Sequence, residues 1–183
     1  MRKHHAIFLV AVITTSLTAC ITYKAPRYQS SAETLLHLQQ LEAAPVALKP
    51  ISRPAGIKDH EQCQTQGQVK ASGGYANYVD AALRAELANA NLLADSAPIQ
   101  LTGYLEKVKF NSWKNSWYLT LELVSSNGHK FTTQTTYSGE GRGYEEETSC
   151  LLVAQSMPSA VKQLLQDAIT SKDFATLLQT APK

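Results

Sequence analysis

The residues of this sequence whose types suit catalysis or metal binding are few: three cysteines and, beyond residue 19, three histidines. None of His37, His60 and His129 stands in a sequence context typical of a catalytic triad or a nucleophile elbow. The glycine-rich stretch 139–143 lacks the spacing and the lysine of nucleotide-binding loops, and the glutamates at 145–147 would repel phosphate. The sequence therefore predicts no enzyme active site and no cofactor.

Cys20 closes an N-terminal segment that is typical of exported proteins. Arg2 and Lys3 precede an uncharged apolar run, residues 6–19. As a helix this run would be about 21 Å long, which is shorter than the roughly 30 Å hydrocarbon core of a bilayer. Residues 1–19 are therefore predicted to be a cleaved signal peptide and not a transmembrane span.

The four residues Leu17-Thr18-Ala19-Cys20 resemble the lipobox of bacterial lipoproteins. The resemblance implies that a diacylglycerol is attached to the Cys20 thiol, that the signal peptide is cleaved before Cys20, and that the new amine is acylated. Ile21, where some lipoproteins carry aspartate, resembles the class that Gram-negative bacteria sort to the outer membrane. We therefore expect an anchor on the inner face of that membrane, with the protein facing the periplasm.

With Cys20 modified, one cysteine pair remains. The periplasm oxidises thiols, so Cys63 and Cys150 are predicted to form a disulfide. Two alternatives stay open: two separately buried thiols, or a metal site that combines Cys63 with residues 59–61, Asp-His-Glu. A metal is the weaker alternative, because a four-coordinate zinc site needs a second close ligand pair and no Cys or His neighbours Cys150.

The charge balance argues against a nucleic-acid partner. The chain has 183 residues, 44% of them hydrophobic, with 17 basic and 15 acidic side chains. Loss of residues 1–19 would remove two basic residues, Arg2 and Lys3, and leave a formally neutral protein. Proteins that bind nucleic acid without sequence preference are usually strongly basic, so we expect none here.

The mature chain divides into a tether and one domain. Residues 20–45 are predicted to form a lipid-anchored tether, because residues 21–29 are polar and aperiodic, followed by one short amphipathic helix that ends by Pro45. Residues 46–183 are predicted to form a single domain. Within it, residues 53–74 contain five Gly and Pro residues and are expected to be an irregular connection.

Two helices are predicted in the domain. Apolar residues at helical spacing predict one helix over residues 75–90 and another from Thr148 or Ser149 to about Ala168. Pro158 lies inside the second pattern and is expected to kink the helix or start a new one, because proline removes a backbone donor.

Three strands are predicted between the helices, over residues 99–110, 117–123 and 131–137. The apolar set changes parity within the first of them, which predicts a bulge near Glu106 and Lys107. A three-residue turn ending at Gly128 would place Leu123 beside Phe131 and keep the apolar face together, with Gly128 in the left-handed region.

This order of elements predicts the α+β class: a two-layer sandwich, with two helices on one face of an antiparallel sheet of three to four strands and the other face partly open. Together with Leu17–Cys20, the arrangement over residues 46–170 resembles the small outer-membrane lipoproteins of the YajG and LptE-like kind. The resemblance implies a non-enzymatic accessory in envelope assembly or transport, with an envelope protein as its partner. An envelope hydrolase is a further, weaker hypothesis.

Two aromatic residues are the partner-binding candidates, Trp113 in a polar turn and Tyr118 on the strand that follows. Trp113 could contact a protein partner or anionic lipid, and the alternative is that it folds back on the sheet edge. A second functional hypothesis is an inhibitor of a secreted or periplasmic enzyme such as lysozyme, which would present residues 139–144 to the enzyme.

Overall fold

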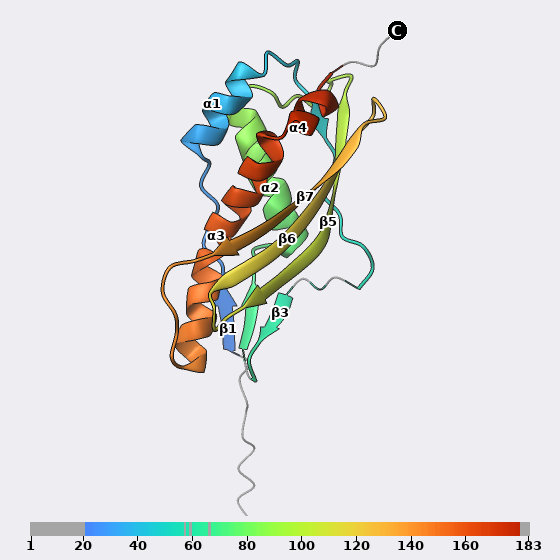
Figure 1. Ribbon diagram of the computed structural model, residues 1–183. Coiled ribbons are helices and arrows are strands. Elements are labelled where there is room, and N and C mark those ends of the chain that lie inside the picture. The colour runs from blue at the N-terminus through green and yellow to red at the C-terminus, as the bar shows by residue number, and fades with distance from the viewer. Residues whose placement is uncertain (1–20, 57, 59, 66, 180–183) are drawn as a thin grey trace, which may run out of the picture.

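The computed structural model describes residues 21–56, 58, 60–65 and 67–179. The predicted signal peptide, residues 1–19, and the predicted lipid attachment site Cys20 lie outside the described residues. Figure 1 shows the order of the elements along the chain. They are β1 (Ile21–Lys24), α1 (Ala32–Gln40), β2 (Ala47–Leu48), β3 (His60–Cys63), β4 (Gly67–Lys70), α2 (Tyr75–Asn89), β5 (Gln100–Asn111), β6 (Ser116–Ser125), β7 (Lys130–Ser138), α3 (Glu146–Ile169) and α4 (Lys172–Leu177).

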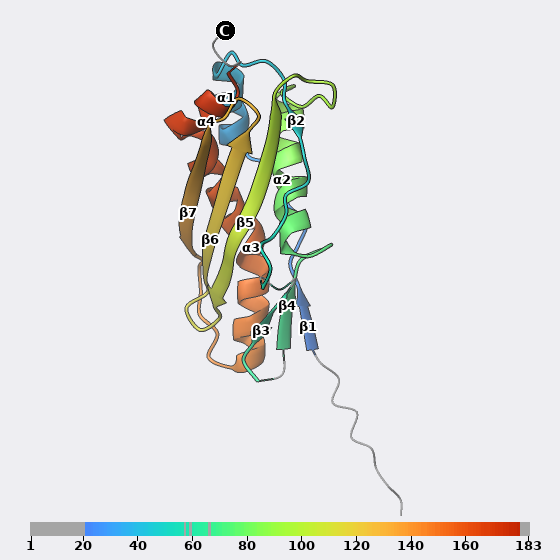
Figure 2. The same cartoon turned by 90° about the vertical axis from the view of Figure 1, so that its right-hand side faces the viewer.

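A four-stranded sheet in the order β2-β5-β6-β7 forms one layer, and α2 and α3 cover one of its faces (Figure 2). The predicted α+β class is confirmed. The sheet is mixed and not purely antiparallel, because β2 pairs parallel with β5 while β5, β6 and β7 are antiparallel. The physical reason is the connection: α2 lies between β2 and β5, and such a crossover brings the chain back in its original direction.

The long strands have the predicted register. The pairing of β5 with β6 shifts between Leu105 and Lys107, where the bulge was expected. Leu123 lies opposite Phe131 across the β6–β7 hairpin. Gly128 has φ +93, the left-handed conformation that this turn requires and that glycine adopts at little cost.

A second sheet, in the order β1-β4-β3, corrects two predictions. Residues 21–29 were expected to be an aperiodic tether, yet β1 pairs parallel with β4 from Ile21 to Lys24. Residues 53–74 were expected to be irregular, yet they contain β3 and β4, which pair antiparallel. Strands of four residues are too short for an alternating pattern to establish them from the sequence, so their pairing defines them.

The core lies between the large sheet and the helices, and Trp117 of β6 is fully buried in it. The Trp117 ring packs edge-on against Tyr75 at 6.1 Å between centroids and tilted against Phe110 at 5.1 Å. The helix α3 runs without interruption through Pro158, so the predicted start of a new helix there is wrong. Buried residues such as Met157 and Val161 flank the proline on the core side, and their packing holds the two halves in one helix.

The segment between β1 and α1, residues 25–31, is fastened to α2, and we call it the N-terminal strap. Tyr28 Oη donates a hydrogen bond to the Glu86 carboxylate, which also accepts one from the Ser31 backbone at 2.9 Å. Tyr78 Oη donates to the Pro26 carbonyl at 2.7 Å, and burial raises the pKa of Tyr78 to about 12. Desolvation and the bond to Glu86 raise the pKa of Tyr28 as well, so both phenols are neutral donors at physiological pH.

Candidate functional site

Four segments that are distant in sequence meet at one end of the molecule, which we call the basal end (Figures 1 and 2). They are the start of β1 at Ile21, the β3–β4 turn at Gln64 and Thr65, the β5–β6 turn at 112–115, and the β7–α3 connection at 139–145. Hydrogen bonds join these segments to one another. Gln64 Nε2 donates to Ser112 Oγ at 2.6 Å, and the Thr65 backbone donates to the Glu146 carboxylate at 2.8 Å.

The predicted disulfide joins β3 to α3 at this end. Cys63 and Cys150 are both fully buried, and their Cα atoms are 5.9 Å apart. The bridge leaves Cys63 without a thiolate for a metal. Within the described residues, no group of three or more His, Cys, Asp or Glu side chains lies close enough to hold a metal ion.

The β5–β6 turn presents Trp113 at the surface, with 48% of the side chain exposed. The turn is held from inside by Asn115, which is 2% exposed and has φ +46. Asn115 Nδ2 donates to the Glu140 carbonyl at 2.8 Å, and Asn115 Oδ1 accepts from Ser156 Oγ at 2.8 Å. Trp113 therefore stands on a rigid turn and does not fold back into the protein.

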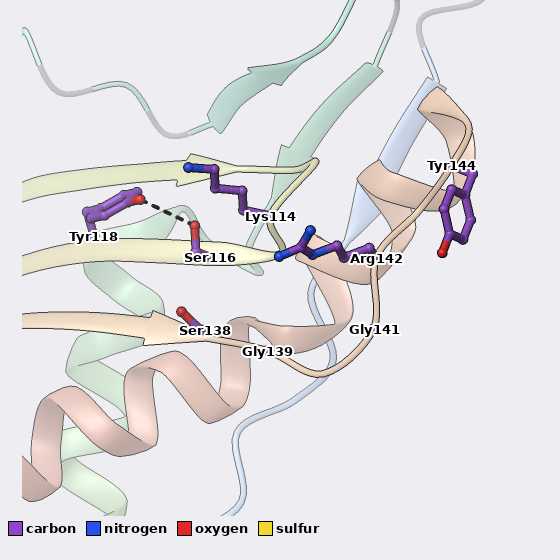
Figure 3. A pocket seen from close by; sticks show the side chains of 8 residues that line it. All are labelled: Lys114, Ser116, Tyr118, Ser138, Gly139, Gly141, Arg142 and Tyr144. Atoms are coloured by element: carbon purple, nitrogen blue, oxygen red, sulfur yellow. Dashed lines mark hydrogen bonds between the residues drawn. The ribbon is translucent and has the colours of Figure 1, made fainter.

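Tyr118, the second candidate, is half-buried and lines a hollow of about 410 Å³ beside this turn (Figure 3). Its phenol oxygen accepts a hydrogen bond from Ser116 Oγ at 3.4 Å. The described lining residues come from the β5–β6 turn, β6, the end of β7 and the β7–α3 connection. They are Lys114, Ser116, Tyr118, Ser138, Gly139, Gly141, Arg142 and Tyr144.

The charges of the hollow set its chemistry. Lys114 and Arg142 contribute two cations, and no carboxylate stands among the described residues that line it. Ser116, Ser138 and Tyr118 add hydroxyl groups, and a guanidinium with an ammonium and hydroxyls suits an anion such as a phosphate monoester or diester. Both cations are present in the sequence, but 28 positions separate Lys114 from Arg142, so nothing in the local sequence indicates that they share one hollow. Only the fold brings them together.

The β7–α3 connection is pinned at both ends, although its middle is exposed. The Gly139 backbone donates to the Asn115 carbonyl at 2.7 Å. Gly143 is buried against Ser149, and a Cβ there would overlap the Ser149 backbone. Tyr144, next to it, is 94% exposed. The connection therefore presents a large aromatic side chain to solvent from a fixed position.

Comparison with known proteins gives likenesses of shape only. No family model matches the chain, and no curated protein matches its sequence. A crystal structure of an uncharacterized protein is 10% identical with a TM-score of 0.47, and the match covers 79% of this chain and 97% of the other. The crystal structure of protein XCC0632 from Xanthomonas campestris, of family DUF330, is 8% identical with a TM-score of 0.46, over 85% and 96% of the two chains.

Proposed function

We propose that this chain is a lipoprotein anchored through Cys20 to the periplasmic face of the outer membrane, where it serves as a non-enzymatic binding or assembly accessory of the envelope. The observation that carries the proposal is the sequence Leu17-Thr18-Ala19-Cys20 behind an uncharged apolar run. Cleavage there would leave Cys20 as the first residue of the mature chain.

Two structural features support this assignment. The first β-strand begins at Ile21, so the folded domain starts directly after the proposed cleavage site. The buried Cys63–Cys150 disulfide agrees with an oxidising compartment such as the periplasm. In the part of the chain that the structure describes, no helix has the length and hydropathy needed to cross a bilayer.

The uncovered face of the large sheet is the proposed surface for an envelope protein. Tyr104, 38% exposed, lies opposite Glu122, and Tyr118 lies opposite Lys109 on the same face. Thr120, between them on β6, is only 7% exposed, since it lies on a central strand between Lys107 and Gln134. Tyrosine is enriched in protein interfaces and polar side chains form their rim, so Tyr104 and Tyr118 are the proposed anchors of this surface.

Lipid attachment is tested by metabolic labelling. We expect labelled palmitate to enter the wild-type protein and not the Cys20→Ala variant, because Cys20 would carry the diacylglycerol and the acylated amine. Wild-type protein should also sediment with outer-membrane vesicles, as two or three acyl chains hold a protein on a bilayer almost permanently. Equal labelling of wild type and Cys20→Ala would contradict the assignment.

Partner contact is tested by proximity labelling in intact cells. The Tyr104→Ala/Tyr118→Ala variant should lose its labelled envelope partner, since truncation of an interface anchor commonly costs more than about 2 kcal/mol. Leu36→Ala is the control, because Leu36 is 61% exposed on α1, away from the uncovered sheet face. An unchanged set of labelled proteins in the double variant, with normal thermal stability, would remove this face from the interface.

The lysozyme-inhibitor hypothesis stays a prediction with its own test. Inhibition would depend on residues 139–144, in which Tyr144 is the most exposed large side chain. An assay of lysozyme activity with the purified protein decides between the two functions: inhibition that Tyr144→Ala abolishes would favour the inhibitor.

A further inference from the structure

Large hydrophobic side chains are exposed mainly at the basal end. Among the described residues, six such side chains are exposed, and four of them belong to this end. Trp113 and Tyr144 come from the two connections described above, Ile21 opens β1 opposite Gly67, and Leu151 adjoins the disulfide at Cys150. The concentration of these side chains beside the start of the mature chain needs a physical explanation, since exposed apolar groups that gather in one region commonly mark an interaction surface.

We propose that the basal end lies on the bilayer surface that holds the anchor, with Trp113 and Tyr144 in the headgroup region and a phospholipid phosphate between Lys114 and Arg142. This docking rests on the proposed lipid attachment at Cys20. It goes beyond attachment because it fixes which end of the domain faces the membrane and which residues touch lipid.

The first argument is the length of the connection to the anchor. One peptide unit separates Cys20 from Ile21, so their Cα atoms are about 3.8 Å apart. Ile21 is already paired in the small sheet, and the N-terminal strap beyond β1 is bonded to α2 through Tyr28 and Tyr78. A lipid on Cys20 therefore brings the basal end directly to the bilayer, with no flexible linker between them.

The second argument is the chemistry of the exposed residues. Tryptophan and tyrosine combine an apolar ring with a polar group, and they are favoured at the interface between hydrocarbon and water. Trp113 and Tyr144 stand on connections that hydrogen bonds and close packing hold fixed, so little conformational entropy is lost when they enter the headgroup region. Lys114, which follows Trp113 in the chain, and Arg142 line the hollow of Figure 3 together with Tyr144.

The third argument concerns the charges of the basal end. They show that this docking differs from the long-range attraction of a basic protein surface to acidic lipids. The basal end also carries carboxylates, at Glu61, Glu140, Glu145, Glu146 and Glu147. These five carboxylates outnumber Lys114 and Arg142, so long-range attraction to acidic lipids does not hold this end on the bilayer. Lys114 and Arg142 therefore act at short range on one phosphate group, which both zwitterionic and anionic phospholipids possess.

The test uses tryptophan fluorescence of the purified, lipidated protein in phosphatidylethanolamine–phosphatidylglycerol vesicles that contain a nitroxide-labelled lipid with the label near the headgroup. Trp117 is fully buried and supplies the unquenched background. We expect the headgroup label to quench most of the Trp113 emission, taken as the difference between wild type and Trp113→Phe.

A matched control places the same chromophore at the opposite end. Leu36 is exposed on α1, which lies away from the basal end in both Figure 1 and Figure 2. In the Trp113→Phe background, Leu36→Trp should give emission that the labelled lipid does not quench. Equal quenching of both chromophores, or none at Trp113, would overturn the docking.

The phosphate contact is tested in the same vesicles. Lys114→Ala/Arg142→Ala should reduce the quenching of Trp113 below the wild-type level, although the anchor still holds the basal end near the bilayer, and vesicles of a phosphate-free galactolipid should have the same effect on the wild type. Lys49→Ala/Lys172→Ala, which removes two exposed cations outside the basal end, is the control and should behave as wild type. Wild-type quenching in the double variant or in the galactolipid would overturn the phosphate site.

Mass spectrometry of the same preparation shows whether Cys20 carries lipid. It therefore distinguishes a failure of the docking from a failure of the proposed anchoring. A Cys20 that carries lipid, together with unquenched Trp113, overturns the docking and leaves the anchoring intact. If Trp113 is unquenched in the vesicles and a photo-crosslinker at position 113 captures an envelope protein in intact cells, this end is a protein interface and the docking is overturned. An unmodified Cys20 contradicts the proposed function and the docking that rests on it.

Discussion

The Cys63→Ser/Cys150→Ser variant is expected to lose about 4 kcal/mol of unfolding free energy. The bridge closes a loop of 87 residues, and in the chain-entropy account a loop of that length greatly restricts the unfolded chain. Both sulfurs are fully buried, so the bridge also contributes to the core at the junction of β3 and α3. Urea unfolding followed by circular dichroism, at matched protein concentration, measures the difference.

Reduction of the wild type supplies the control for this variant. Wild-type protein unfolded in the presence of a reductant should have the midpoint of the double variant, because both lack the same covalent bond. Mass spectrometry of non-reduced peptides should find Cys63 linked to Cys150. Two alkylatable thiols in freshly isolated native protein, or equal midpoints with and without the bridge, would show that the disulfide does not stabilise this fold.

Trp117→Ala is expected to cost about 4 kcal/mol, at the level of other large aromatic truncations in a protein core. The indole is fully buried against Tyr75 and Phe110, so its removal leaves a cavity in the core between the sheet and the helices. It also removes hydrogen bonds from Trp117 Nε1 to the Val153 carbonyl at 3.0 Å and to Ser156 Oγ at 3.1 Å. Thermal and urea unfolding should both show the loss.

Two further variants serve as controls, one for the packed volume of the Trp117 side chain and one for the difference between a buried and an exposed tryptophan. Trp117→Phe keeps most of the packed volume and should cost less than Trp117→Ala. Trp113→Ala, four residues away on an exposed turn, should change stability by no more than about 0.5 kcal/mol. A large loss for Trp113→Ala, comparable with that of Trp117→Ala, would mean that Trp113 packs on the protein after all.

Local patterns in the sequence determined the long elements. The parity change at Glu106 and Lys107 placed the bulge, because side chains alternate strictly along a strand and only an inserted residue restores the apolar face. The turn at Gly128 determined the register of the β6–β7 hairpin, since the alternative register would have split the apolar set. The number of cysteines predicted the Cys63–Cys150 disulfide, because only one pair remains once Cys20 is assigned to the lipid.

The short elements depended on tertiary contacts. The β1, β3 and β4 strands have four residues each, which is too few to establish an alternating pattern, and β1 pairs with β4 although 46 positions separate Ile21 from Gly67. The N-terminal strap depends on Glu86, a buried carboxylate on α2 whose partners Tyr28 and Ser31 lie more than 50 positions earlier. Propensity acts over a few residues and cannot detect such bonds.

The candidate site likewise depends partly on local sequence and partly on tertiary contacts. The polar turn predicted Trp113 at the tip between two strands, because polar residues favour turns, but it left open whether the side chain is exposed or folds back on the sheet edge; in the structure 48% of it is exposed. The residues that lie near Trp113 could not be predicted from local sequence. Tyr144, Arg142 and Ile21 reach the same end of the molecule only because β1, the β5–β6 turn and the start of α3 are packed together. A site assembled from distant segments is a property of the packed core that positions them, and that core exists only in the folded chain.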